Sequence, residues 1–230
     1  TSSPTPRSKS GPEAAPEPPS PHVSHQPHDD LNPPQSLKAA ALAAPLRSQT
    51  PPPGSSNEIV GTYPYRSEFP VSAWWDLITG ATRQIDLLGY TLYFLAMQHP
   101  ELVDTLRRKC DDGCVVRAAI ADPISPHVAY RDAEEDQPIT LTVRINSTIK
   151  HFTPLLDCEN FQVRYQDIPL YNSIFRFDDE MLVTPHLYAT TGASAPMLHL
   201  RRTGNGGLFG RFANHFETVW FNTAPVDWTS

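Results

Sequence analysis

The sequence predicts an α/β sandwich, with helices packed on a mixed β-sheet, preceded by a disordered proline-rich tail. Of the 90 hydrophobic residues, 78 lie in residues 58–230, which is enough for one domain with its own core. Within that region a strand–helix–strand pattern comes first. Four short strand-like runs and a closing amphipathic helix follow, an order typical of a mixed sheet covered by helices.

The first 57 residues have the composition of a linker. They hold 14 of the 25 prolines and none of the 22 aromatic residues, so they lack the apolar surface needed to offset chain entropy. We therefore expect residues 1–57 to be a disordered Pro/Ser-rich linker and residues 58–230 to be the domain. The chain begins with Thr1 rather than Met, and we expect it to be part of a longer protein.

Charge and hydropathy exclude several classes of function. The tail is formally neutral, so the net charge of −7 belongs to the domain, and an acidic domain without a Lys/Arg cluster is poorly suited to bind duplex DNA directly. No apolar run is long enough to span a membrane, and no signal peptide opens the chain. We expect a cytoplasmic protein that does not bind membranes.

The three cysteines do not form a metal-binding pattern. Cys110, Cys114 and Cys158 lack the paired spacing of a zinc site. We expect them to be small buried thiols in a reducing compartment, and we expect neither a metal nor a cofactor.

The first half of the domain predicts a strand–helix–strand unit after an opening helix. Ser72 can cap the opening helix. Residues 84–95 are mostly apolar and rich in strand formers, which predicts a buried strand. A helix follows between Pro100 and Gly113, and residues 114–123 predict a second buried strand. Because the crossover is a helix, the two strands should be parallel.

The second half adds a helix, a set of short strands and a closing helix. Apolar residues recur at helical intervals over residues 139–157, where Pro154 should kink or end the helix. An amphipathic helix over residues 208–220 closes the domain. The acidic residues 178–180 predict a hairpin turn between two strands. The predicted strands of this half are residues 161–166, 172–178, 181–187 and 197–201.

Residues 171–183, YNSIFRFDDEMLV, resemble the active-site strand of the phospholipase D superfamily. That family carries the motif H-x-K-x-x-x-x-D, in which the His is the nucleophile and the Lys neutralises phosphoryl oxygens. Aligned on Asp178, the family's His falls on Tyr171 and its Lys on Ser173. The resemblance implies a phospholipase-D-like fold with a single motif, in which two of the three diagnostic residues are replaced.

A larger part of the chain resembles an uncharacterised phospholipase-D-like domain found at the C-terminus of bacterial helix-turn-helix transcriptional regulators. This resemblance implies a variable linker and a DNA-binding domain before it, so that DNA is contacted only through a missing N-terminal domain. It also implies a homodimer, because enzymes of the superfamily need two copies of the motif and this chain has one. The resemblance covers residues 61–226, with matching segments at 81–95, 116–123, 131–135, 170–179, 185–188 and 195–200.

The replaced motif favours a binding site over a catalytic one. We expect no phospholipase D chemistry, because neither Tyr171 nor Ser173 supplies the required cation; if the site is active, Tyr171 and Asp178 are the candidate catalytic residues. A site without its nucleophile can still hold a small polar or anionic ligand. The predicted ligand-binding residues are Tyr171, Asn172, Ser173, Arg176, Asp178, Asp179, His186 and Arg164.

Several of these charged residues have structural alternatives. Arg176 and Asp178 lie two residues apart and could satisfy each other in a salt bridge, and Asp179 could be a solvated turn residue. Arg131, with Glu134 and Glu135, has the spacing of helical ion pairs and predicts a surface cluster, with a role at the rim of the site as the alternative.

The sequence therefore predicts a non-catalytic ligand-sensing or effector domain of a bacterial transcriptional regulator whose DNA-binding domain is absent from this chain. The alternative is a phosphodiesterase or nuclease of the phospholipase D superfamily with substituted active-site residues. A third hypothesis is a protein-interaction module without a small ligand, which a filled site around Tyr171 and Arg176 would favour.

Overall fold

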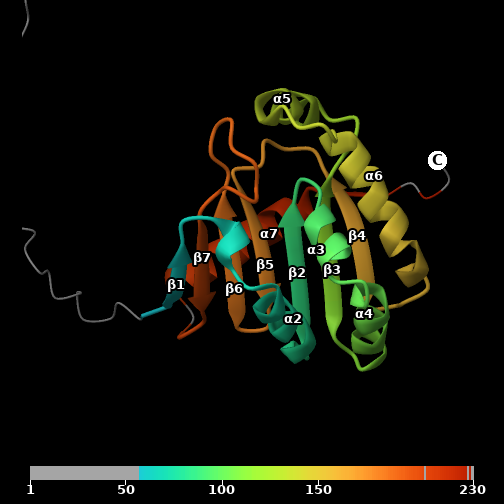
Figure 1. Ribbon diagram of the computed structural model, residues 1–230. Helices are drawn as coiled ribbons and strands as arrows, with labels where there is room; N and C mark the ends of the chain where they lie inside the picture. Colours follow the sequence, from blue (N-terminus) through green and yellow to red (C-terminus); the bar gives the residue numbers. More distant parts are fainter. Residues whose placement is uncertain (1–56, 205, 227, 229–230) are drawn as a thin grey trace, which may run out of the picture. The chain divides into compact units, whose positions relative to one another are not determined.

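The computed structural model describes residues 57–204, 206–226 and 228. Its centre is an eight-stranded mixed sheet with the strand order β1-β7-β6-β5-β2-β3-β4-β8 (Figure 1). The predicted linker, residues 1–57, lies outside the described residues except for Asn57. The strands are β1 (Ile59–Tyr63), β2 (Gln84–Gly89), β3 (Val115–Ala121), β4 (Phe161–Gln166), β5 (Asn172–Phe177), β6 (Glu180–Pro185), β7 (Met197–Arg201) and β8 (Ala224–Pro225).

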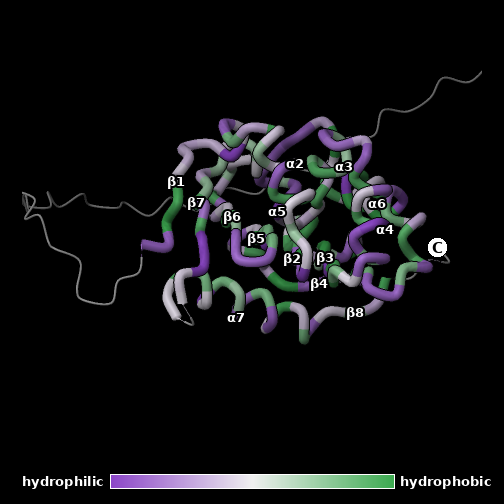
Figure 2. The backbone as a smooth tube through the Cα atoms, turned by 90° about the horizontal axis from the view of Figure 1, so that it is seen from below, coloured by the Kyte–Doolittle hydropathy of each residue, from purple (hydrophilic) through white to green (hydrophobic). Residues whose placement is uncertain are grey.

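Helices cover both faces of the sheet, which confirms the predicted α/β sandwich. Figure 2 shows α7 along one side of the sheet, and α2, α3, α4 and α6 on the other. Each interface has its own apolar core: Trp74 and Phe175 belong to the larger one, and Ile174 and Phe216 to the one under α7. The helices are α2 (Val71–Gly80), α3 (Tyr93–Gln98), α4 (Leu102–Asp111), α5 (Pro126–Glu135), α6 (Leu141–Phe152) and α7 (Gly207–Phe221), with short 3₁₀ turns at Arg66–Glu68 and Thr153–Leu155.

Strand pairing confirms that the sheet is mixed. β2, β3 and β4 run parallel to one another, as predicted for β2 and β3, and the other neighbouring pairs are antiparallel. The predicted hairpin is also confirmed: β5 and β6 pair from Asn172 opposite Pro185 to Phe177 opposite Glu180. The antiparallel pair β2–β5 joins the two halves of the domain at the middle of the sheet.

The strand predicted over residues 84–95 is too long. β2 ends at Gly89, and residues 93–98 form α3. Leu92 adopts a left-handed φ of 52°, which breaks the extended chain, and the Tyr93 N–H donates a hydrogen bond to Thr91 Oγ1 at 3.3 Å. A short apolar run suits a buried helix as well as a buried strand, so periodicity could not separate the two.

Helix α5 was missed by the sequence analysis although its start carries a recognisable signal. The Ser125 hydroxyl caps the helix by accepting a hydrogen bond from the His127 N–H at 3.1 Å, and Pro126 occupies the first turn. The edge strand β1 was also missed. In α6, by contrast, the predicted early end is confirmed, because Pro154 lies in the 3₁₀ turn that follows Phe152.

The cluster around Arg131 is buried rather than on the surface. The guanidinium donates hydrogen bonds to the carboxylates of Glu134 and Glu135 and to the carbonyls of Leu187 and Thr190. The last two residues belong to the loop after β6, which covers the arginine and leaves it only 6% exposed. Arg131 therefore fixes α5 against this loop.

The three cysteines are free and buried, as the sequence predicted for small thiols. Burial raises the pKa of Cys110 to about 12, so its thiol stays protonated. In the part of the chain that the structure describes, no helix has the length and apolar character needed to cross a membrane.

A buried ion network ties the middle of the sheet to α7. The Asp86 carboxylate, 1% exposed, accepts hydrogen bonds from Arg117 Nε at 2.8 Å, Arg176 Nη1 at 3.4 Å and Gln84 Nε2 at 2.7 Å. Arg117 also donates to Glu217 on α7 at 2.6 and 3.0 Å. Asp86 thus pairs two arginines that lie between the sheet and the helix.

Replacing Asp86 with Asn should destabilise the fold strongly. Removing the charge leaves Arg176 buried without an ionic partner, and breaking a buried ion pair in this way costs about 3–5 kcal/mol. We expect Asp86→Asn to lower the free energy of urea unfolding by about 3 kcal/mol. The exposed residue Asp167 provides the control, since Asp167→Asn should change the free energy of unfolding by less than about 0.5 kcal/mol. Equal stability of the two variants would contradict the role of Asp86.

Asp178 organises the turn between β5 and β6. Its carboxylate accepts hydrogen bonds from the main-chain N–H groups of Thr82, Arg83 and Gln84 at 2.8, 2.9 and 2.8 Å, just where β2 begins. The residue itself has a left-handed φ of 52°, a conformation that Asp tolerates better than most residues. Although burial raises the pKa of Asp178, the three N–H donors outweigh it and lower the pKa below its ordinary value of 3.8.

The stabilising effect of Asp178 should depend on pH. A carboxyl group with a depressed pKa in the folded state stabilises the protein above its unfolded pKa, and this contribution is lost as the pH falls through the folded value. We expect Asp178→Asn to lower the free energy of unfolding by about 1–2 kcal/mol at pH 7. Below about pH 4 the difference from the wild-type protein should shrink, as measured by urea unfolding over a pH series. A difference that stays constant down to pH 2 would contradict this assignment.

Candidate functional site

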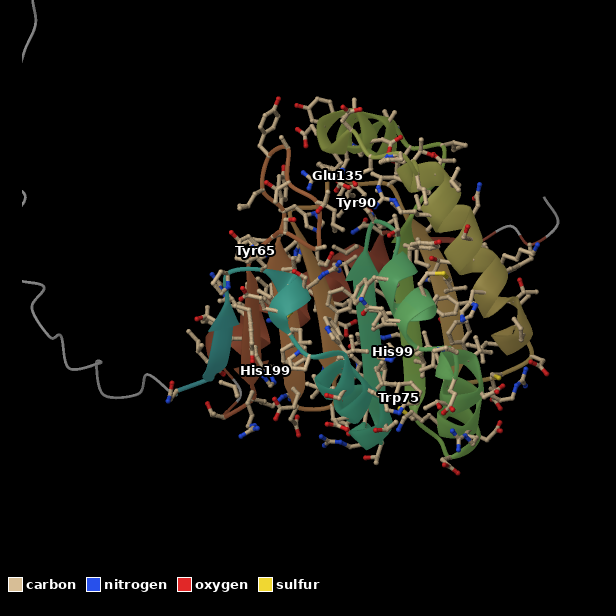
Figure 3. All side chains as sticks on the ribbon, viewed as in Figure 1. Tyr65, Trp75, Tyr90, His99, Glu135 and His199 are labelled. Atoms are coloured by element: carbon tan, nitrogen blue, oxygen red, sulfur yellow. The ribbon has the colours of Figure 1, made fainter. Side chains whose placement is uncertain are left out.

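A cavity of about 260 Å³ lies where β2 ends and β5 begins, on the face of the sheet that carries four helices. Figure 3 shows Tyr90 and Glu135, the last residue of α5, at this end of the sheet. The walls of the cavity come from five separate segments of the chain. The lining residues are Arg66, 89–94, Glu135, Gln137, Leu141, Arg144, Ser173, Phe175, His186 and 191–193.

Ser173 and His186 form a hydrogen-bonded pair in the wall of this cavity. Ser173 Oγ lies 2.9 Å from His186 Nε2, and His186 Nδ1 lies 3.0 Å from the carbonyl oxygen of Leu170. A carbonyl oxygen can only accept, so Nδ1 carries the hydrogen. Burial, together with the charges of Arg131 and Arg66, lowers the pKa of His186 to about 4 even though the Leu170 carbonyl favours the protonated ring. The imidazole is therefore neutral near pH 7, and Nε2 accepts the hydrogen of the Ser173 hydroxyl.

Two neighbours hold this pair in place. The ring of Tyr90 stacks on His186 with 5.3 Å between ring centroids, and its hydroxyl accepts a hydrogen bond from the Leu170 N–H at 3.3 Å. Gly89 provides the space: a Cβ atom there would lie 3.3 Å from Ser173 Oγ and 3.0 Å from a methyl carbon of Leu92. The orientation of the pair thus depends on contacts from both β2 and the loop before β5.

Arg66 presents an unpaired cation to the cavity. Its guanidinium carbon lies 3.8 Å from the centre of the Phe94 ring, and the charge of Glu135 attracts it, but its side chain forms no salt bridge or hydrogen bond with a described residue. Burial lowers the pKa of Arg66 to about 10, which still leaves it charged at pH 7. Because nearly all half-buried guanidinium groups in proteins have acceptors, this one has the character of a binding group for an anion.

Arg144 adds a second unsatisfied donor. Its Nη2 donates to Glu135 at 3.3 Å, whereas its Nε is buried without a partner among the described residues. Glu135 is shared, since its other oxygen accepts a hydrogen bond from Arg131 at 3.0 Å. The charged residues that line the cavity are Arg66, Arg144 and Glu135, so the lining has a net positive charge.

The structure separates the residues that the sequence grouped into one site. Ser173 and His186 meet at the cavity, whereas Tyr171 precedes β5 with its side chain 72% exposed and outside the cavity lining. Asn172 lies on the opposite face from Ser173, because side chains alternate along a strand. Arg164 lies under α7, where its guanidinium packs 5.2 Å from the Trp220 ring.

Arg176, Asp178 and Asp179 also lie away from the cavity. Asp178 comes five positions after Ser173 along an extended strand, a span of roughly 17 Å. Arg176 pairs with Asp86, and its Nε donates to the main-chain carbonyl of Asp178 rather than to the carboxylate, so the salt bridge considered for this pair does not form. Asp179 pairs with Arg83 and Arg202 at the hairpin turn.

The sequence analysis missed Arg66 and Arg144, the two donors without full partners. Neither lies in a motif, and 77 residues separate them in the chain. They line one cavity only because the loop 191–193 and α6 pack over the end of β2. No group of three or more His, Cys, Asp or Glu side chains is placed to hold a metal ion among the residues described.

Comparison with solved structures finds similarity at low sequence identity. TrmBL2, described as an archaeal chromatin protein, is 14% identical with a TM-score of 0.45; the match covers 84% of this chain and 62% of TrmBL2, so the chain spans less than two thirds of that protein. Nuc from Salmonella typhimurium, a phospholipase D family member, is 13% identical with a TM-score of 0.42, and the match covers 72% of this chain and 97% of Nuc. NucT from Helicobacter pylori is 10% identical with a TM-score of 0.43, and the match covers 72% of this chain and 98% of NucT.

These TM-scores are below 0.5, and nothing about the activity of this chain follows from them. No curated protein matches the sequence. A family model does match, over residues 56–227, and its description is "Domain of unknown function (DUF5919)". Because the match covers most of the chain, this protein belongs to the DUF5919 family.

Proposed function

We propose that the domain binds a small anionic ligand in the cavity at the end of β2 and acts as the effector domain of a bacterial transcriptional regulator. The observation that carries the first part is the guanidinium of Arg66, which has no salt bridge or hydrogen bond with a described residue and lines a cavity also lined by Arg144, whose buried Nε lacks a partner. A carboxylate or phosphate group would satisfy both donors in a charge-assisted contact.

The regulatory part of the proposal is supported by the resemblance of residues 61–226 to C-terminal domains of helix-turn-helix regulators. In such an arrangement the ligand-binding domain does not touch DNA, which suits a domain with an acidic net charge. The proline-rich residues 1–57 would serve as the linker to a DNA-binding domain outside this chain. In this proposal, ligand binding changes the relative position of the two DNA-binding domains of a dimer.

The alternative function, a phosphodiesterase that uses Tyr171, has little support in the geometry. The Tyr171 side chain is exposed outside the cavity, and Asp178 caps the start of β2 at the other end of β5. The two candidate catalytic residues therefore cannot act on one phosphodiester. A Tyr171→Phe variant that abolished turnover of bis(4-nitrophenyl) phosphate would restore this alternative. Neither Tyr171 nor Arg176 lines the cavity, which agrees with the expectation for a module that binds only proteins. We prefer a small ligand because the cavity beside Ser173 would have no role in such a module.

Anion binding should depend on Arg66. We expect inorganic phosphate to bind the wild-type protein in isothermal titration calorimetry, and Arg66→Gln to weaken that binding at least tenfold, because a charge-assisted hydrogen bond contributes about 1.5–3 kcal/mol. Arg211→Gln is the matched control: Arg211 is an exposed arginine on α7, on the other side of the sheet. Equal affinity of the wild-type protein and Arg66→Gln would count against the proposal.

The regulator proposal also includes a homodimer, which suits a two-fold symmetric operator. We expect light scattering to give twice the mass of one chain at micromolar concentration. A single-chain mass at high micromolar concentration would argue strongly against a dimeric effector domain.

A further inference from the structure

The donors and acceptors around Ser173 are arranged so that its hydroxyl can lose its hydrogen to His186 and attack a substrate. Leu170 supplies the acceptor, His186 Nδ1–H donates to it, and Nε2 is left to accept the hydrogen of Ser173 Oγ at 2.9 Å. This arrangement of nucleophile, base and orienting acceptor is the one that nucleophilic catalysis by serine requires. Here a main-chain carbonyl takes the place of the orienting carboxylate.

We propose that Ser173 is a nucleophile with His186 as its general base, and that the cavity hydrolyses small carboxylic esters that carry an anionic group. This activity is distinct from phosphodiester hydrolysis through Tyr171. The choice of an anionic substrate rests on the proposed function, since Arg66 and Arg144 would bind the anionic end. The reactivity of Ser173 itself does not depend on that function.

The surroundings of the pair meet the needs of such a reaction. The imidazole is neutral, so its Nε2 lone pair is available to take a proton. The substrate's negative charge would offset the positive field of Arg131 and Arg66 and make the ring more basic. Tyr90 acts as a positioning residue, because its ring stacks on His186 and its hydroxyl binds Leu170, which holds both residues in place. Gly89 allows the hydroxyl to face the cavity.

The reaction balances with water as the only co-reactant. Ser173 Oγ forms a bond to the ester carbonyl carbon while its proton passes to His186 Nε2, and the negative charge gathers on the carbonyl oxygen in the positively charged cavity. The carbon–oxygen bond to the alcohol then breaks, and the alcohol leaves with the proton from His186. Water adds to the acyl group with His186 again as base, and Ser173 recovers its hydrogen as the acid departs.

Labelling with an alkyl fluorophosphonate tests the nucleophile directly. The reagent is neutral and forms a stable bond to reactive serines with loss of fluoride. We expect one label on the wild-type chain, located at Ser173 by mass spectrometry of peptides. His186→Asn should slow labelling at least tenfold, and Ser173→Ala should abolish it. Ser147→Ala is the matched control: the Ser147 hydroxyl lies on the exposed side of α6, donates to the Val143 carbonyl and should be irrelevant.

A second variant covers the case in which Ser173→Ala fails to fold. Ser173→Cys should react with iodoacetamide faster than the three native cysteines, because its thiol would line the cavity beside His186, whereas burial raises the pKa of all three native thiols. Absence of label on the folded wild-type protein would overturn the proposal. So would labelling at an equal rate in His186→Asn, because the hydroxyl would then not be activated by the ring.

Hydrolysis of two esters separates this proposal from the proposed function. We expect the wild-type protein to cleave mono-4-nitrophenyl succinate, which carries a carboxylate, at least tenfold faster than 4-nitrophenyl acetate, measured as kcat/KM. Arg66→Gln should remove this preference but keep labelling of Ser173 by the neutral fluorophosphonate. If the preference is absent while Ser173 is labelled, anion binding fails and the nucleophile stands. If phosphate binds but Ser173 is inert to both reagents, the nucleophile fails and anion binding stands.

Discussion

The antiparallel pairing of β2 with β5 is the constraint on which the rest of the structure depends. It places Leu88 opposite Ile174, Leu87 opposite Phe175 and Asp86 opposite Arg176. With this register Gly89 comes next to Ser173, and Arg176 faces α7 beside Asp86. A shift of one residue would exchange the two faces of β5, so that Ser173 would point at the apolar core under α7 and Arg176 would enter the core between the sheet and α2. One pairing therefore sets both the ion network and the cavity.

The arginines of the domain divide into two kinds by their partners. Arg117, Arg131 and Arg176 each bind at least one carboxylate and hold elements together. Arg176 has Asp86 as its one carboxylate partner among the described residues, so removing Asp86 leaves a buried charge without compensation. Arg66 has the same chemistry, but its side chain packs on the Phe94 ring and forms no salt bridge with a described residue. The difference in pairing, and not the residue type, is our reason for proposing a binding role for Arg66 and a structural role for the others.

Much of the fold could be predicted because the signals are local. The runs that became β3, β4, β5, β6 and β7, the hairpin at Asp178 and the closing helix are patterns within a few residues, and the structure confirms them. The error at residues 90–95 arose where local information is ambiguous, since an apolar run of that length suits either a strand or a helix. The left-handed conformation of Leu92 results from packing that only the assembled domain provides.

The sequence by itself determined that an aromatic-free, proline-rich segment precedes one α/β domain, because composition and periodicity are properties of the chain alone. It also placed Ser173 among the residues of interest, through the resemblance of residues 171–183 to a known motif, and His186 as a polar residue expected on a neighbouring strand. The tertiary structure decided which polar groups meet. Whether an arginine is paired, which nitrogen of a histidine accepts a hydrogen, and which segments enclose a cavity all depend on residues far apart in sequence. Those contacts come from the register of the sheet and the closure of loops over its end, and no local pattern records them.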